Sequence, residues 1–207
     1  MKTHKRVLAM IALVAIASLG QAPAVNAAVG TDGVTLQTDV QEVITLDCGS
    51  ATVNLGNLTP GTPVTGSSVC TATTNANGGY NLAVRKDDAT DTTMDKNTEA
   101  AVNIADLTAW DPTDLGNAAV WSGTGLGFTV FESTATKNTD WWGTGSTVTD
   151  AANKYAGFNA AQTDIMRHTA YADLATTTTI GYKLDVPSTQ KSGAYSGAIT
   201  YQATTTP

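Results

Sequence analysis

The sequence predicts an all-β protein: an antiparallel β-sandwich with one disulfide and long loop insertions. Several short segments alternate apolar and polar residues with a period of two, as strands with one buried face do. Glycine, proline and asparagine gather between these segments, as they do in turns. Threonine, a β-branched residue with strand preference, supplies 37 of the 207 residues. Many short strands separated by turns favour a sandwich over a helical fold.

The first 27 residues have the features of a secretion signal. A positively charged N-terminus precedes the apolar stretch from Val7 to Leu19, and small residues at positions 25–27 precede a cleavage site. The apolar stretch of thirteen residues is too short to span a membrane comfortably. We therefore expect residues 1–27 to be removed and the mature chain to be secreted, to the extracellular space or the cell surface.

The mature chain is acidic. The signal takes away three of the eleven basic residues and none of the eighteen acidic ones, which leaves a net charge of −10. Nucleic acids and anionic membranes are poor partners for such a surface. No second apolar stretch of spanning length follows, so we expect no membrane insertion after cleavage of the signal.

The opening of the mature chain carries the clearest alternation. From Val34 to Cys48 the even positions are mainly apolar and the odd positions mainly polar. Fifteen extended residues span roughly 50 Å, whereas a typical strand has about 5–6 residues. The run therefore either bends into two strands or overhangs its own domain. We predict an N-terminal extension at residues 28–41, a candidate donor strand for a neighbouring subunit, followed by a single domain at residues 42–207.

Further strands are expected along the domain, with polar or glycine-rich connections between them. The expected strands are 51–55, 69–74, 80–85, 100–104, 118–121, 126–131, 178–186 and 195–203. Residues 75–79 form a tight turn in a hairpin-like arrangement, and residues 187–193 form the turn of a C-terminal hairpin. Long polar connections are expected at 56–68, 86–99 and 133–153, and a short helix at 160–168.

The two cysteines of the chain are Cys48 and Cys70. A secreted chain with an even number of cysteines favours a disulfide, and two cysteines allow one pairing. Such a bond closes a loop of about twenty residues, worth roughly 3 kcal/mol in the chain-entropy model. A catalytic or metal-binding thiol is the competing interpretation.

Three stretches together resemble a known group of bacterial surface proteins. They are Ile44-Thr45-Leu46-Asp47-Cys48, then Ser67-Ser68-Val69-Cys70 leading to Gly79-Tyr80-Asn81-Leu82, and finally Gly193-Ala194-Tyr195-Ser196-Gly197-Ala198-Ile199-Thr200-Tyr201. This layout is similar to the sandwiches of chaperone–usher pilins and spore coat protein U. The resemblance covers roughly the first third of the mature domain and its last strands, and residues 86–174 have no counterpart.

The resemblance implies an incomplete Ig-like sandwich that polymerises through an N-terminal donor strand. By position, the donor side chains would be Val34, Leu36, Thr38 and Val40. The resemblance also implies the Cys48–Cys70 disulfide. Besides the unmatched residues 86–174, this chain departs from the pattern because the donor segment lies unusually close to the first domain strand.

Residues for catalysis are sparse, so we predict no enzyme and no cofactor. His168 is the only histidine of the mature chain, and no Gly-x-Ser-x-Gly motif accompanies it. A single histidine with two oxidised cysteines does not make a zinc site. A glycosidase needs two placed carboxylates, and no pair is distinguished by its spacing.

Two other groups of residues are candidate ligand contacts. Asp87, Asp88, Asp91 and Asp95 are a weak calcium candidate, since they lack the spacing of an EF-hand loop, and a solvated loop is the favoured alternative. Trp141 and Trp142 lie in a polar insert and could contact a glycan, although packing under their own loop is favoured.

Asn57 begins an Asn-Leu-Thr glycosylation sequon, a pattern that arises often by chance in a threonine-rich chain.

Two functions remain open at this stage. The first is a structural subunit of an extracellular filament or surface layer, with copies of itself as partners in a head-to-tail homopolymer. The second is an adhesin or carbohydrate-binding module whose tryptophan-bearing loops bind host or cell-surface glycans. The first rests on the overhanging alternation and the second on Trp141 and Trp142.

Overall fold

The computed structural model describes residues 30–207 except 50, 89–90, 114 and 135–136, and the proposed signal sequence lies outside this range. The chain divides into two units, Met1–Asp39 and Val40–Pro207. The second unit is an all-β, Ig-like antiparallel sandwich with one disulfide, as the sequence predicts. In the first unit, the described residues 30–39 have no regular secondary structure.

The larger of the two main sheets has four strands in the order β1-β2-β10-β7. These strands are β1 (Ile44–Asp47), β2 (Val64–Thr74), β10 (Ala172–Asp185) and β7 (Gly125–Ser133). All neighbours are antiparallel, and the register includes Ile44 opposite Thr74 and Tyr182 opposite both Gly66 and Phe128. β10 is one of the two interior strands, which agrees with its run of β-branched threonines.

The second main sheet has three strands in the order β12-β3-β9. They are β12 (Ile199–Thr205), β3 (Tyr80–Lys86) and β9 (Thr163–His168). One hydrophobic core joins the inner faces of both sheets. Its fully buried members include Phe128 and Ile180 from the larger sheet and Leu82 and Ile165 from the smaller one.

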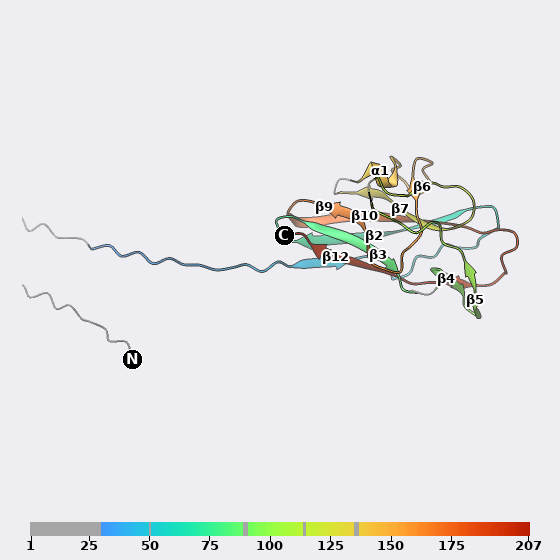
Figure 1. The fold of residues 1–207 in the computed structure, drawn as a ribbon, viewed down its shortest axis with the longest axis horizontal. Coiled ribbons are helices and arrows are strands. Elements are labelled where there is room, and N and C mark those ends of the chain that lie inside the picture. Colours follow the sequence, from blue (N-terminus) through green and yellow to red (C-terminus); the bar gives the residue numbers. More distant parts are fainter. Residues whose placement is uncertain (1–29, 50, 89–90, 114, 135–136) are drawn as a thin grey trace, which may run out of the picture. The chain divides into compact units, whose positions relative to one another are not determined.

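Short strands and one helical turn complete the domain. A small sheet of order β11-β4-β5 consists of β11 (Tyr195–Ser196), β4 (Met94–Lys96) and β5 (Glu99–Ile104). Within the domain, β4 and β5 lie at the opposite end from the C-terminus (Figure 1). β6 (Ala119–Val120) pairs with β8 (Lys154–Tyr155), and α1 (Thr139–Trp142) is the helical turn.

The core strand at 126–131 and the short strand at 100–104 are confirmed as parts of β7 and β5, and the strand expected at 118–121 is reduced to the two residues of β6. Residues 51–55, in contrast, form no strand. Val53 and Leu55 pack half-buried against the core, but their backbone has no ladder partner in the described chain. The strand expected at 69–74 begins earlier, at Val64, and the connection expected at 86–99 contains β4.

Both expected hairpins are wrong, because each pair of strands divides between the two sheets. The turn at 75–79 carries the chain from β2 to β3, and Gly79 adopts the left-handed region at φ 81° there. β10 and β12 likewise belong to different sheets. Alternation identifies a strand and its buried face, but it does not say which strand lies beside it.

The helix expected at 160–168 is also wrong, since Thr163–His168 is the strand β9. β9 pairs with β3, and a register shift occurs where Leu82 lies opposite Met166 and Ala83 lies opposite Asp164. This shift allows two successive residues, Ile165 and Met166, to be buried, which hides the period of two.

Candidate assembly interface

Two edge strands, one from each main sheet, lie next to each other in the domain. β1 is the outer strand of the larger sheet and β12 the outer strand of the smaller sheet. No pairing joins them, and no strand in the described part of the chain pairs with the outer edge of either. We call these two adjoining, unpaired edges the seam. The seam offers backbone N–H and C=O groups to an added strand.

Apolar side chains line the seam without being fully covered. Ile44 and Leu46 on β1 pack against the core, as do Ile199, Tyr201 and Ala203 on β12, and all five are half-buried. Side chains at the centre of the sandwich, in contrast, are fully buried, with Phe128 and Ile180 each 0% exposed. The hydrophobic core is therefore open along the seam.

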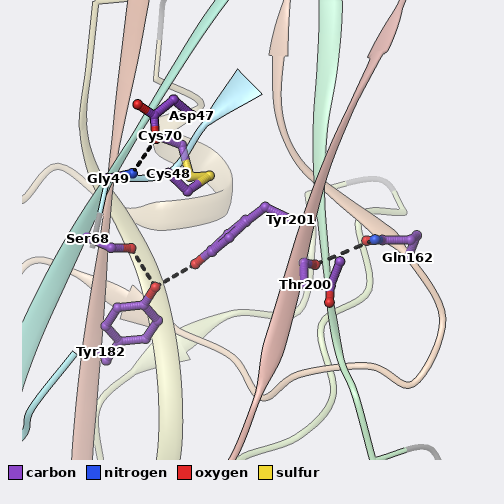
Figure 2. Close-up of a disulfide and its surroundings, with 9 residues drawn as sticks. All are labelled: Asp47, Cys48, Gly49, Ser68, Cys70, Gln162, Tyr182, Thr200 and Tyr201. Carbon is purple, nitrogen blue, oxygen red and sulfur yellow. Dashed lines mark hydrogen bonds between the residues drawn. A yellow bond between two sulfur atoms is a disulfide. The ribbon is translucent and has the colours of Figure 1, made fainter. Parts of the chain in front are cut away.

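A disulfide holds the short strand at one side of the seam. Cys48 follows β1 directly and bonds to Cys70 in β2, which confirms the predicted bond (Figure 2). The turn after β1 is closed by Asp47, whose carboxylate accepts a hydrogen bond from the backbone N–H of Gly49 at 2.9 Å. β1 has four residues, so this cross-link fixes a strand that would otherwise depend on a very short ladder with β2.

A chain of hydroxyl groups crosses the sandwich beside the disulfide. The Tyr182 hydroxyl shares hydrogen bonds of 2.6 Å with Ser68 Oγ and with the Tyr201 hydroxyl (Figure 2). Burial raises the pKa of Tyr201 well above 10, and the neighbouring Tyr182 raises it further. Burial also raises the pKa of Tyr182. Both phenols therefore stay protonated at neutral pH and link β10 to the edge strand β12 as neutral groups.

The residues of the candidate donor strand are exposed in the structure. Val34 is 84% exposed, Leu36 91% and Val40 81%, and Thr38 is exposed as well. Large apolar side chains with this exposure, at alternating positions, form one apolar side of an extended segment. The strand β1 includes only Ile44–Asp47 of the predicted run, so its apolar alternation continues well beyond the paired residues.

Residues 41–43, which we call the linker, are held on the domain by the turn after β2. The side-chain amide of Asn75 accepts a hydrogen bond from the Val43 N–H at 2.6 Å and donates one to the Gln41 carbonyl at 2.9 Å. Thr74 Oγ1 also donates to the Val43 carbonyl at 2.8 Å. Asn75 thus pairs with the linker much as a further residue of β2 would. Sequence reasoning missed this contact, because an asparagine in a turn has many equally ordinary roles.

Both tryptophans of the candidate glycan site are buried in the main core. Trp141 is 5% and Trp142 1% exposed, and Trp142 packs against Phe128 with ring centroids 5.1 Å apart. The Trp142 indole N–H donates to the Ile165 carbonyl at 2.8 Å. Trp141 also borders a surface depression of about 300 Å³ with Arg167, whose guanidinium lies 5.5 Å from the Trp141 ring centre. Neither ring presents an open face for stacking on a sugar.

Three of the four aspartates of the weak calcium candidate are engaged in local contacts. Asp87 pairs with Arg85 at 3.3 Å, and Asp88 accepts a hydrogen bond from the Asp91 N–H at 3.2 Å. Asp91 also accepts a hydrogen bond from the Asn103 side chain, while Asp95 lies on β4. Among the residues that the structure describes, no three acidic, histidine or cysteine side chains are grouped so as to hold a metal ion.

The remaining candidates occupy ordinary positions. His168, the histidine weighed for catalysis, ends β9 with its ring 5.5 Å from that of Tyr80. Asn57, the sequon residue, is exposed in the connection between β1 and β2. Over the described range, no helix has the length and hydropathy to cross a membrane.

No protein-family model matches this chain, and no curated protein matches it significantly. The seam, the exposed N-terminal residues and the linker are the features of this chain that bear on its function.

Proposed function

We propose that this protein is the structural subunit of an extracellular filament or cell-surface layer, assembled head-to-tail from copies of itself. The N-terminal extension of one subunit would insert as an added strand into the seam of the next. The observation that carries the proposal is that one chain contains both an open apolar seam and an exposed apolar ribbon.

The spacing of the two parts supports this pairing. The inward-facing residues of β12 recur at every second position, as do the apolar residues of the extension. β12 provides Ile199, Tyr201, Ala203 and Thr205, and the extension provides Val34, Leu36, Thr38 and Val40. Alternate residues of any strand are about 6.6 Å apart, so four donor side chains match four positions along the seam.

Energetics favour occupation of the seam. Full burial of a valine or leucine side chain contributes about 1.5–3 kcal/mol, so three such donor residues contribute roughly 5–9 kcal/mol before the costs of association. The added strand would also satisfy the unpaired backbone groups of two sheet edges. A donor and an acceptor on the same chain make a contact that does not close on itself, so a filament follows.

The proposal includes secretion through the expected signal and a likeness to chaperone–usher pilins and spore coat protein U. The −10 net charge of the mature chain supports an exposed, soluble surface rather than a nucleic-acid or membrane partner. The buried indoles of Trp141 and Trp142 give the adhesin alternative no comparable support.

Deletion of Ala28–Gln41 tests the proposed function. The shortened chain keeps its seam but has no donor, so we expect monomers in negative-stain microscopy where the intact mature chain forms filaments. Added to intact subunits, the shortened chain should occupy only one filament end and reduce filament length as its proportion rises. Filaments of unchanged abundance after the deletion would refute the proposal.

A further inference from the structure

The end of the domain around the linker carries an apolar surface of its own. Val43 is 59% exposed and Tyr171 54%. Val43 and Tyr171, with Asn75 and Asp173, line a shallow depression of about 250 Å³. We call Val43 and Tyr171 the linker patch. They come from the segment before β1 and from the residue preceding β10, so they are brought together only by the fold.

The shortness of the linker determines what lies opposite this patch in a polymer. Four residue steps separate Val40 from Ile44, and an extended chain advances at most about 3.6 Å per residue, so their Cα atoms lie within about 14 Å. A compact domain of this size has a radius of gyration of roughly 15 Å. If Val40 is inserted in a neighbouring copy, the two domains must therefore touch beside the linker.

Hydrogen bonds to the linker make this approach closer still. Asn75 and Thr74 hold Gln41 and Val43 against the domain, so these residues do not act as a free tether. The surface next to Val43 then has to face the neighbour, and that surface is the linker patch.

We propose that the linker patch is a second contact between neighbouring copies, docked on the surface that flanks the neighbour's seam. This inference rests on the proposed function and adds to it. The inserted strand supplies affinity, while the patch fixes the angle between successive domains. A filament built with both contacts is stiff, since a strand joined by a flexible tether alone would let each domain swivel.

The test compares single substitutions in the full mature chain. Val43→Asp places a charge in the contact and removes an apolar side chain from it, so subunit affinity should fall about tenfold or more. The filaments that remain should bend more in micrographs. Tyr171→Ser should act in the same direction. Leu115→Asp is the matched control, because Leu115 is 70% exposed in a different loop, and it should change neither property.

A chain with a longer linker tests the contribution of the patch separately from that of the inserted strand. Gly-Ser-Gly-Ser placed between Gln41 and Glu42 should give flexible filaments in which Val43→Asp has no further effect. Filaments that respond equally to Val43→Asp and Leu115→Asp would overturn the inference alone, and so would an undiminished Val43→Asp effect in the long-linker chain. An intact chain that forms no polymer at all would overturn the proposed function as well.

Discussion

Leu36 gives the sharpest test of donor-strand insertion, because its side chain is 91% exposed in the free extension. Leu36→Ala removes three carbon atoms from a side chain that would be buried in the seam. At about 0.8 kcal/mol per buried methylene, the loss is about 2.4 kcal/mol, or about a 50-fold weaker contact between subunits. The next residue, Gln37, would face away from the core, so Gln37→Ala should change the affinity by less than about twofold.

The measurement is the dissociation constant between subunits, obtained by analytical ultracentrifugation of the purified mature chain over a dilution series. Both variants lie outside the folded domain, so their melting temperatures as monomers should equal that of the unmodified chain. The reasoning would be refuted if Leu36→Ala and Gln37→Ala weakened association equally, since an added strand must distinguish its two faces.

Three further predictions concern the stability of the domain. Replacing Cys48 and Cys70 with serine should lower the free energy of unfolding in urea by about 3 kcal/mol, the value for a loop of this size, and equal stabilities with and without the bond would contradict it. Phe128→Ala should cost about 3–5 kcal/mol in the same assay, because Phe128 is fully buried between two aromatic rings, and a cost below about 1 kcal/mol would show that the core collapses around the gap. Two lysines at 2.6 and 2.7 Å lower the pKa of Glu99 from 4.5 to about 2, so its contribution to stability is present above pH 4.5 and is lost as the pH falls to 2. Glu99→Gln should therefore flatten the pH dependence of urea unfolding between pH 4.5 and 2, and a slope identical to that of the unmodified chain would exclude this ion-pair effect.

The sequence predicted the sandwich and its disulfide because both depend on local or compositional signals. Alternation marked the buried faces of β7 and β10, and Leu126 and Ile180 are buried as expected. The pairing of strands could not be predicted from the sequence, since a segment with a period of two fits any sheet edge equally well. The register shift of β9 breaks that period, so its sequence does not show the alternation of a strand.

The candidate interface was only partly predictable. The exposed apolar residues of the extension follow from the sequence, because alternation beyond the length of one strand can be seen in one dimension. The seam could not be predicted, as it depends on β1 and β12, about 150 residues apart, becoming outer strands on the same side. The contact of Asn75 with the linker and the Tyr182–Tyr201 pair likewise arise from the three-dimensional arrangement alone.

The Cys48–Cys70 disulfide makes the edge strand β1 depend on the redox state of its surroundings. A reducing cytosol keeps both cysteines in the thiol form. Without the disulfide, the four-residue strand β1 at the seam would separate from β2 more readily. Under the proposed function, the acceptor edge would then be incomplete until the polypeptide met an oxidant. Assembly would accordingly begin only after the chain had left a reducing compartment.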